Sequence, residues 1–224
     1  MNLKRKFIAI ILARGGSKGI KLKNLIKIKK KPLLGWTIDQ CSKSKMISKI
    51  YVSSENKKII NFVKRKKVNC IIRPNNLAKD NSSSIDGAIH ALKNLKKEDK
   101  KNNNIIFLQA TSPIRKKNAI DKALKKFIKG NYDSIFSSLI LKDYYVWQKK
   151  NKKFKANYNY KIRLPRQKLD TKYLENGSFY IFKKDFFMKK KTLFLGKIGT
   201  FPMSKTESFQ LDDLEDKKII EKLI

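Results

Sequence analysis

The sequence predicts an α/β protein with a three-layer, mostly parallel, doubly wound sheet. Short runs of β-branched and other apolar residues alternate with amphipathic segments of helical period, which is the order of successive βαβ units. The strand-like runs are apolar throughout, as is typical of parallel strands buried on both faces. At 224 residues the chain is predicted to form a single domain over residues 1–224.

The predicted elements follow one another in regular order. Strands are expected over residues 7–12, 49–53, 69–72, 104–108, 133–137 and 178–182. Helices are expected over residues 32–41, 57–66, 85–95 and 117–129, and from about Asp213 onward. Pro32 suits a first helical turn, and the Asp80 to Ser84 segment offers N-cap residues for the helix behind it.

Residues 142–176 interrupt this regularity. Most of the segment is aromatic and basic, and it has neither a helical nor a strand period. Ordered connections of this length are uncommon in compact domains unless they serve a function. The segment is therefore predicted to be an excursion from the sheet.

The formal net charge of +37 allows two interpretations. Clustered Lys and Arg neutralise phosphates, so one alternative is a basic nucleic-acid-binding protein. However, the lysines are spread over the whole chain, only seven of the 55 basic residues are Arg, and no stacking aromatics alternate with them. Compositional drift explains this pattern better, so neither a specific nucleic acid nor a membrane is an expected partner.

The remaining composition favours a cytoplasmic protein. The apolar run at residues 7–13 leads into a charged loop and is far shorter than the roughly 18–20 residues that cross a bilayer. Cys41 and Cys70 are expected to be small buried thiols, since nothing else indicates secretion. The single histidine, His90, is expected to pack on a helix, and one histidine with two distant cysteines excludes a zinc site.

Polar clusters stand at the ends of the predicted strands, where sheets of this kind bind ligands. The first cluster, ARGGSKG at residues 13–19, follows the most apolar strand. Its glycines let backbone N–H groups approach an anion closely, and Arg14, Lys18 and Lys23 add positive charge. It matches neither the Walker A order nor the GxGxxG fingerprint. By itself the loop indicates phosphate binding, with a solvated basic loop as the alternative.

Further motifs follow this loop in a fixed order. They are LARGGSKGI at residues 12–20 with Lys23-Asn24, Arg73-Pro74, Leu77-Ala78 with Asp80, LQATSPIR at residues 108–115, Pro165-Arg166-Gln167, Asn176-Gly177 and Leu211-Asp212. Together they resemble the acylneuraminate (CMP-sialic acid) cytidylyltransferase family, which includes legionaminate and pseudaminate cytidylyltransferases. The resemblance spans residues 6–216, and the ordered set is much more specific than any one motif.

The resemblance implies a Rossmann-like fold of the nucleotide-diphospho-sugar transferase type. It implies transfer of CMP from CTP to the C2 hydroxyl of a nonulosonic (sialic-type) acid, with release of pyrophosphate and with Mg²⁺ or Mn²⁺ as cofactor. It also implies a homodimer, in which residues 142–176 form a dimerisation and sugar-side excursion.

The resemblance further implies roles for individual residues. The catalytic residues would be Arg14, Lys18 and Asp212. The CTP-binding residues would be Ala13, Arg14, Gly15, Gly16, Ser17, Lys18, Lys23, Asn24, Arg73, Ser82 and Ser83. The sugar-binding residues would be Gln109, Thr111, Ser112, Arg166, Gln167 and Asn176.

The expected metal site departs from the family pattern. The family usually has Asp-x-Asp where this chain has Gln210-Leu211-Asp212. Asp212 keeps a hard oxygen ligand for Mg²⁺, whereas Gln210 offers only a neutral carbonyl as a weaker second ligand. A catalytically weakened homologue is therefore a further alternative. Asp213, Glu215 and Asp216 are expected to be structural acids in the first turn of a helix.

Overall fold

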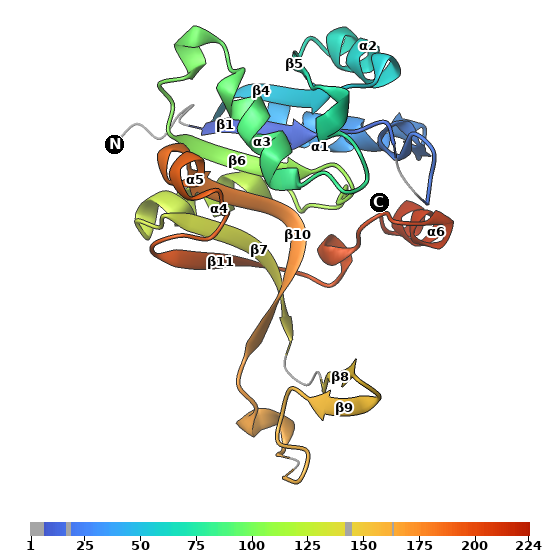
Figure 1. Cartoon of the computed structure of the whole chain (residues 1–224), viewed down its shortest axis with the longest axis vertical. Helices are drawn as coiled ribbons and strands as arrows, with labels where there is room; N and C mark the ends of the chain where they lie inside the picture. The colour runs from blue at the N-terminus through green and yellow to red at the C-terminus, as the bar shows by residue number, and fades with distance from the viewer. Residues whose placement is uncertain (1–6, 17–18, 142–144, 163) are drawn as a thin grey trace.

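The computed structural model describes residues 7–16, 19–141, 145–162 and 164–224 (Figure 1). At its centre is a seven-stranded sheet in the order β11-β7-β10-β6-β1-β4-β5. Its strands are β1 (Phe7–Leu12), β4 (Ile47–Ser54), β5 (Asn69–Ile72), β6 (Asn104–Gln109), β7 (Ser134–Leu141), β10 (Lys172–Lys183) and β11 (Ile198–Met203). Strand β10 runs antiparallel to its neighbours, and the other pairings are parallel. The predicted mostly parallel α/β sheet is confirmed.

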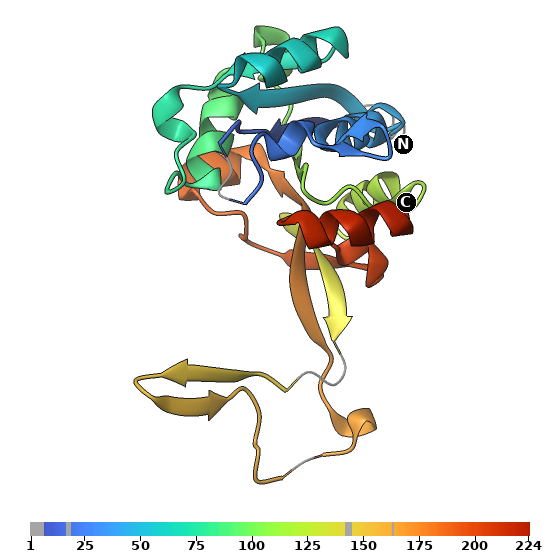
Figure 2. The same cartoon turned by 90° about the vertical axis from the view of Figure 1, so that its right-hand side faces the viewer.

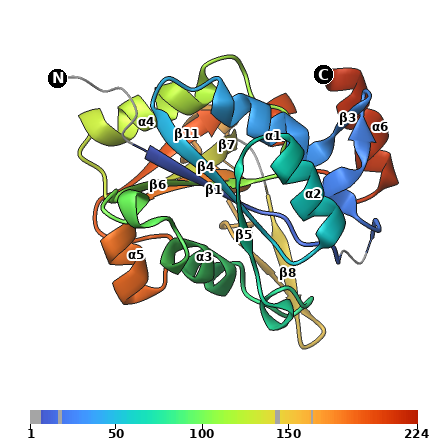
Figure 3. The same cartoon turned by 90° about the horizontal axis from the view of Figure 1, so that it is seen from above.

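Helices cover both faces of this sheet. They are α1 (Leu33–Ser42), α2 (Lys57–Arg65) and α4 (Ala119–Lys129) on one face, and α3 (Ser84–Lys93) and α5 (Lys184–Lys190) on the other (Figure 3). Successive residues of β1 alternate between the two cores, since Ala9 and Ile11 pack on the α1 side and Ile8 and Ile10 on the α3 side. Burial on both faces explains why this strand is an unbroken apolar run.

A third, smaller core joins the C-terminal helix α6 (Leu214–Leu223) to the loop after β1. Leu211 and Ile220 pack there with Ile20, Ile28 and Leu33, beside the short strands β2 (Lys27–Ile28) and β3 (Lys31–Pro32). This packing holds residues about 190 positions apart in the sequence side by side. It therefore places the segment before α6 next to the predicted phosphate-binding loop.

The start of α6 confirms a structural role for two of its acids. The Asp213 carboxylate accepts hydrogen bonds from the backbone N–H groups of Glu215 and Asp216, and Asp216 returns the contact to the backbone of Asp213. This reciprocal arrangement is a capping box. Asp216 also accepts from the backbone N–H of Asp212 at 2.8 Å, so the cap fixes the position of Asp212.

Between β7 and β10 the chain leaves the sheet as an arm. The arm carries a hairpin of β8 (Trp147–Lys150) and β9 (Lys153–Ala156) and a 3-10 turn, η4 (Arg166–Lys168), which stand away from the sheet (Figures 1 and 2). The rings of Tyr145, Trp147, Tyr158 and Tyr160 contact one another. The hairpin has no alternating pattern because nearly all its residues are exposed.

Several elements differ from the sequence prediction, among them the unpredicted short strands β2, β3, β8 and β9. Strand β11 and helix α5 are additional, and β11 is an edge strand interrupted by Gly199 and Pro202, which hides its pattern. Asn176 and Gly177 lie inside β10 and not before it. The register shifts between Glu175 and Tyr180, and Gly177 adopts φ +66°, so a bulge bends the strand at this point.

Both thiols and the histidine lie close to where the sequence places them. Cys41 is buried, Cys70 is half-buried, and both are free. His90 is half-buried on α3, where burial and the charge of Arg73 lower its pKa. Within the described ranges, no helix is long and apolar enough to cross a membrane.

Candidate active site

A cavity of about 590 Å³ opens at the carboxyl ends of β1, β5 and β6. Five segments line it: the loop after β1, the connection after β5, the start of α3, the loop after β6, and the residues before α6. The lining residues from these segments include Arg14, Gly19, Lys23, Asn24, Arg73, Lys79, Asp80, Ser82, Ser83, Ser84, Gln109, Ala110, Thr111 and Asp212. The carboxyl ends of parallel strands meet at one edge of the sheet, which brings these distant segments together.

Arg14 crosses the cavity from the loop after β1 to the segment before α3. Its Nη2 atom lies 3.0 Å from Asp80 Oδ1, and its Nη1 atom donates to the carbonyl of Lys79 at 2.9 Å. The Arg14 carbonyl accepts from the side chain of Asn24, which is buried. One third of the Arg14 side chain remains exposed, so the guanidinium can meet a ligand in the cavity.

Lys23 and Asp212 form the second ion pair of the cavity. Lys23 lies in the 3-10 helix η1 (Lys23–Leu25), and its Nζ atom donates to Asp212 Oδ1 at 2.9 Å and to the Leu211 carbonyl at 3.0 Å. The Asp212 side chain is 72 % exposed. A Cβ atom on Gly19 would lie 2.9 Å from the Asp212 carbonyl oxygen, so this close approach needs glycine.

Arg73 enters the cavity from the end of β5. Its side chain is only 4 % exposed and pairs with Glu55, whose Oε2 atom lies 3.2 Å from Nη2. The Glu55 Oε1 atom accepts from the backbone N–H of Gly15 at 2.6 Å. Ser83 completes this side as the N-cap of α3, accepting from the backbone N–H of Ile85.

The loop after β6 is held by a buried arginine, Arg115. Its guanidinium donates to the backbone carbonyls of Gln109 and Ser178 and to the side chains of Thr37 and Gln40. Burial lowers the pKa of Arg115 to about 10. The cation stays protonated at neutral pH, and it fixes the turn that carries Gln109 and Thr111 into the cavity.

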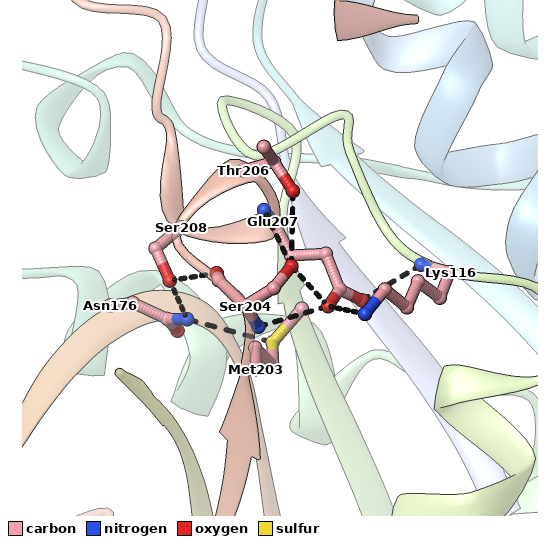
Figure 4. A network of polar contacts seen from close by, with 7 residues as sticks. All are labelled: Lys116, Asn176, Met203, Ser204, Thr206, Glu207 and Ser208. Carbon is pink, nitrogen blue, oxygen red and sulfur yellow. Dashed lines mark hydrogen bonds and ion pairs between the residues drawn. The ribbon is translucent and has the colours of Figure 1, made fainter. Parts of the chain in front are cut away.

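A polar network around Glu207 supports the chain that leads to Asp212 (Figure 4). The Glu207 carboxylate accepts from the backbone N–H groups of Lys116 and Ser204 and from the Ser204 hydroxyl. The Asn176 side chain donates to Ser208 Oγ at 3.0 Å in the same network. It therefore ties the loop after β6 and the bulge of β10 to the turn η5 (Thr206–Ser208).

Replacing Glu207 with Gln is expected to lower stability by about 1–2 kcal/mol at neutral pH, because an amide cannot accept all three hydrogen bonds. Burial alone raises the pKa of Glu207, but the bonds from Lys116 and Ser204 and the Lys116 charge outweigh it and lower the pKa below 4.5. A lowered folded-state pKa gives stabilisation that is complete above about pH 5 and is lost as the pH falls through 4.5 and below. Urea unfolding of both proteins at neutral and acid pH measures this. If the wild-type protein and Glu207→Gln lost the same amount of stability on acidification, this expectation would be contradicted.

The structure brings only some of the proposed site residues to the cavity wall. Arg14, Lys23, Asn24, Arg73, Ser82, Ser83, Gln109, Thr111 and Asp212 line it. Gly15 and Gly16 line a neighbouring depression with Glu55 and Asn56, and Ala13 and Ser112 are fully buried. Ser17 and Lys18 lie outside the described residues, as does the side chain of Arg166.

Three further residues of the sequence-based proposal lie apart from this wall. Gln167 is exposed on the arm. Asn176 is buried, and its carbonyl accepts a 2.6 Å hydrogen bond from the side-chain amide of Gln210. A carboxylate at position 210 could not donate this bond, so Gln210 here supports the β10 bulge.

Sequence reasoning missed Glu55 and Arg115 as site residues. Glu55 directly follows the end of β4, which is the same signal that singled out the other polar clusters. Arg115 ends the motif at residues 108–115, but its burial could not be read from a chain so rich in cations.

The residues of the cavity fit a divalent ion that takes most of its ligands from the substrate phosphates and few from the protein. Among the described residues, no group of three or more His, Cys, Asp or Glu side chains gathers to hold a metal. The two carboxylates of the cavity, Asp80 and Asp212, each pair with one cation, and Asp212 is the more exposed of the two, at 72 % against 48 %. Mg²⁺ commonly binds through one or two carboxylates together with substrate phosphates, and the site suits that mode.

Comparisons with known proteins show the family to which the chain belongs. A family model described as cytidylyltransferase matches residues 8–224. The chain belongs to this family. It is 30 % identical over 213 residues to N-acylneuraminate cytidylyltransferase A of Danio rerio, covering 93 % of the chain and 48 % of the relative. The chain thus spans about half the length of that relative.

One further relative and one solved structure match over nearly their whole length. The chain is 28 % identical to post-translational flagellin modification protein B of Campylobacter coli, covering 98 % of the chain and 95 % of the relative. A solved structure of CMP:2-keto-3-deoxy-manno-octonic acid synthetase, complexed with CTP, superposes with a TM-score of 0.71 at 16 % identity. That match covers 97 % of this chain and 98 % of the other, which confirms the fold.

Proposed function

We propose that this cytidylyltransferase family member transfers CMP from CTP to the C2 hydroxyl of a nonulosonic acid and releases pyrophosphate. One observation carries the proposal: Arg14, Lys23 and Arg73 converge with Asp212 on a single cavity at the sheet edge. Relatives named N-acylneuraminate cytidylyltransferase over nearly the whole chain support the choice of nucleotide and sugar class.

The reaction forms a bond between the sugar C2 oxygen and the α-phosphorus. It breaks the bond between that phosphorus and the oxygen that bridges it to the β-phosphate. The hydroxyl proton leaves to solvent, and pyrophosphate carries the displaced charge. Catalysis of such transfers is mainly positioning and charge neutralisation. Arg14 and Lys23 supply fixed positive charge in the cavity, and we assign the triphosphate to them and to the loop at residues 15–18.

The cavity has two further sides, to which the other parts of the substrates are assigned. Arg73, Ser82 and Ser83 stand together on the side of α3, and we assign the cytidine to them. Gln109 and Thr111 stand at the end of β6, and we assign the sugar to them. The buried Asn176 acts on that side through the bulge that it stabilises.

A homodimer is part of the proposal. Gln167 lies on the arm and not in the cavity of its own chain, so its proposed sugar contact requires the arm to reach another cavity. The arm exposes several large apolar side chains, including Trp147, Phe154 and Ile162, of the kind that a partner subunit would cover.

Asp212 would hold a Mg²⁺ or Mn²⁺ ion together with the phosphates of CTP. The ion would supply neutralisation of the negative charge that develops on the triphosphate. Lys23 holds the Asp212 carboxylate at the cavity wall, and the Asp216 cap fixes its backbone. Gln210 directs its amide nitrogen to the Asn176 carbonyl, so it contributes at most its carbonyl oxygen.

The experiment that tests this function is a panel of sugars. Purified protein with CTP and Mg²⁺ is incubated in turn with N-acetylneuraminic, legionaminic, pseudaminic and Kdo acids, and pyrophosphate is measured. Release with one or more of the first three acids, well above release with Kdo, is expected. No release with any of the three nonulosonic acids would contradict the proposal.

A further inference from the structure

Glu55 occupies a junction that the proposed roles do not include. It lies directly after β4, and its side chain is 13 % exposed. One carboxylate oxygen accepts from the backbone N–H of Gly15 at 2.6 Å, and the other lies 3.2 Å from Arg73 Nη2. Hydrogen bonds to an ionised acceptor are shorter and stronger than neutral ones. One partly buried carboxylate thus joins the phosphate-binding loop to the cation on the α3 side of the cavity.

The turn around Glu55 also holds the loop through its backbone and through packing. The backbone N–H of Ala13 donates to the Ser53 carbonyl at 3.0 Å. A Cβ atom on Gly15 would lie 2.5–2.8 Å from the Asn56 side chain, so the glycine packs directly on the turn. The start of the loop is therefore fixed to the end of β4 by three separate contacts.

The same turn fixes Arg73. The backbone N–H of Arg73 donates to the Ser54 carbonyl at 3.0 Å, while its guanidinium pairs with Glu55. Its Nε atom is buried and has no hydrogen-bond partner in the described part of the chain. A Cβ atom on Gly87 would lie 3.2 Å from Arg73 Nη1, so α3 also closes on this side chain. Without Glu55, the buried guanidinium of Arg73 would lose the ion pair that orients it.

Glu55 is not among the residues that line the main cavity. It lines the neighbouring depression with Gly16 and Asn56, whereas Arg73 lines the main cavity. Its carboxylate contacts the backbone N–H of Gly15 and the guanidinium of Arg73. It can therefore orient both groups from outside the main cavity.

We propose that Glu55 is a positioning residue for CTP, which sets the geometry of Arg73 and of the Gly15 loop from outside the main cavity. The inference rests on the proposed function, because it assigns Glu55 to the same nucleotide site. Glu55 touches no reacting atom, so its effect falls on nucleotide binding and on the KM for CTP. Such uniform binding effects leave kcat close to its original value.

The test measures CTP binding directly by titration calorimetry, with Mg²⁺ and without sugar. Glu55→Gln keeps the size of the side chain and removes its charge, and we expect its Kd for CTP to rise about tenfold or more. The matched control is Glu98→Gln, at an exposed carboxylate of the turn η3 (Lys97–Asp99), with an expected change below about twofold. If Glu55→Gln does not fold, Glu55→Asp, whose shorter side chain cannot span both partners, is measured with the same expected loss.

A double mutant separates positioning from a general effect on folding. If Glu55 acts mainly through Arg73, adding Glu55→Gln to Arg73→Ala should raise the Kd by clearly less than it does in the wild-type background. An undiminished effect in that background would overturn the coupling. Unchanged CTP binding by Glu55→Gln, with wild-type binding intact, would overturn the role of Glu55 and leave the proposed function standing. No CTP binding by the wild-type protein would overturn the proposed function itself.

Discussion

Replacing Asp212 with Ala is expected to reduce turnover by about 10²- to 10³-fold while the protein stays folded. Its carboxylate is 72 % exposed in the cavity, so its removal leaves no buried void, and Lys23, whose side chain is 14 % exposed, keeps its hydrogen bond to the Leu211 carbonyl. The loss removes the anionic ligand proposed for the divalent ion and frees Lys23 from its ion pair. Steady-state turnover with saturating CTP and thermal unfolding measure the two expectations.

Two variants show whether the Asp212 effect is specific. Asp212→Asn keeps the size of the side chain and removes its charge, and its loss should approach that of Asp212→Ala. Glu215→Ala changes an exposed acid in the first turn of α6 and should leave turnover within about twofold. If Asp212→Ala keeps more than about a tenth of wild-type turnover, the residue has no part in the chemistry.

Replacing Arg14 with Ala is expected to reduce kcat/KM for CTP by about 10²-fold or more. Arg14 is the residue that spans the cavity, with its guanidinium anchored to Asp80 and to the Lys79 carbonyl. This anchoring holds a planar fork of donors where the triphosphate is assigned. Arg14→Lys should also be impaired, because a single ammonium cannot reproduce the fork.

The matched control for Arg14 is Arg65→Ala, an exposed arginine at the end of α2. Both variants lower the net charge by one, so a general loss of electrostatic attraction would affect them equally. We expect Arg65→Ala to retain wild-type kcat/KM. Equal reductions in the two variants would contradict a specific role for Arg14 and would favour attraction by the overall charge.

The part of the fold that the sequence predicts well is the part that is buried on both faces. Strands β1 and β6 are unbroken apolar runs because the helices of two layers cover them. Strand β11 lies at the sheet edge with half-exposed residues, and the hairpin β8–β9 is almost wholly exposed. Neither β11 nor the hairpin shows a periodic hydrophobic pattern in the sequence, so their strands are determined by their tertiary surroundings.

The candidate site likewise contains some residues that the sequence predicts and some that it does not. Arg14, Arg73 and Gln109 were accessible to sequence reasoning, because each follows a strand and parallel strands end at one edge. The pairing of Glu55 with Arg73, and the burial of Arg115, were not accessible. In a chain with 55 basic and 18 acidic residues, the sequence does not show which cations are buried or which acid faces them.

The most direct test of the central claim is the stoichiometry of one reaction mixture. Wild-type protein, CTP, Mg²⁺ and the preferred nonulosonic acid are followed by phosphorus NMR, which resolves CTP, pyrophosphate and the CMP ester. One pyrophosphate and one CMP-sugar should appear for each CTP consumed, and CTP should persist when the sugar is omitted. Consumption of CTP without a CMP-sugar, or persistence of CTP with every acid tested, would contradict the claim.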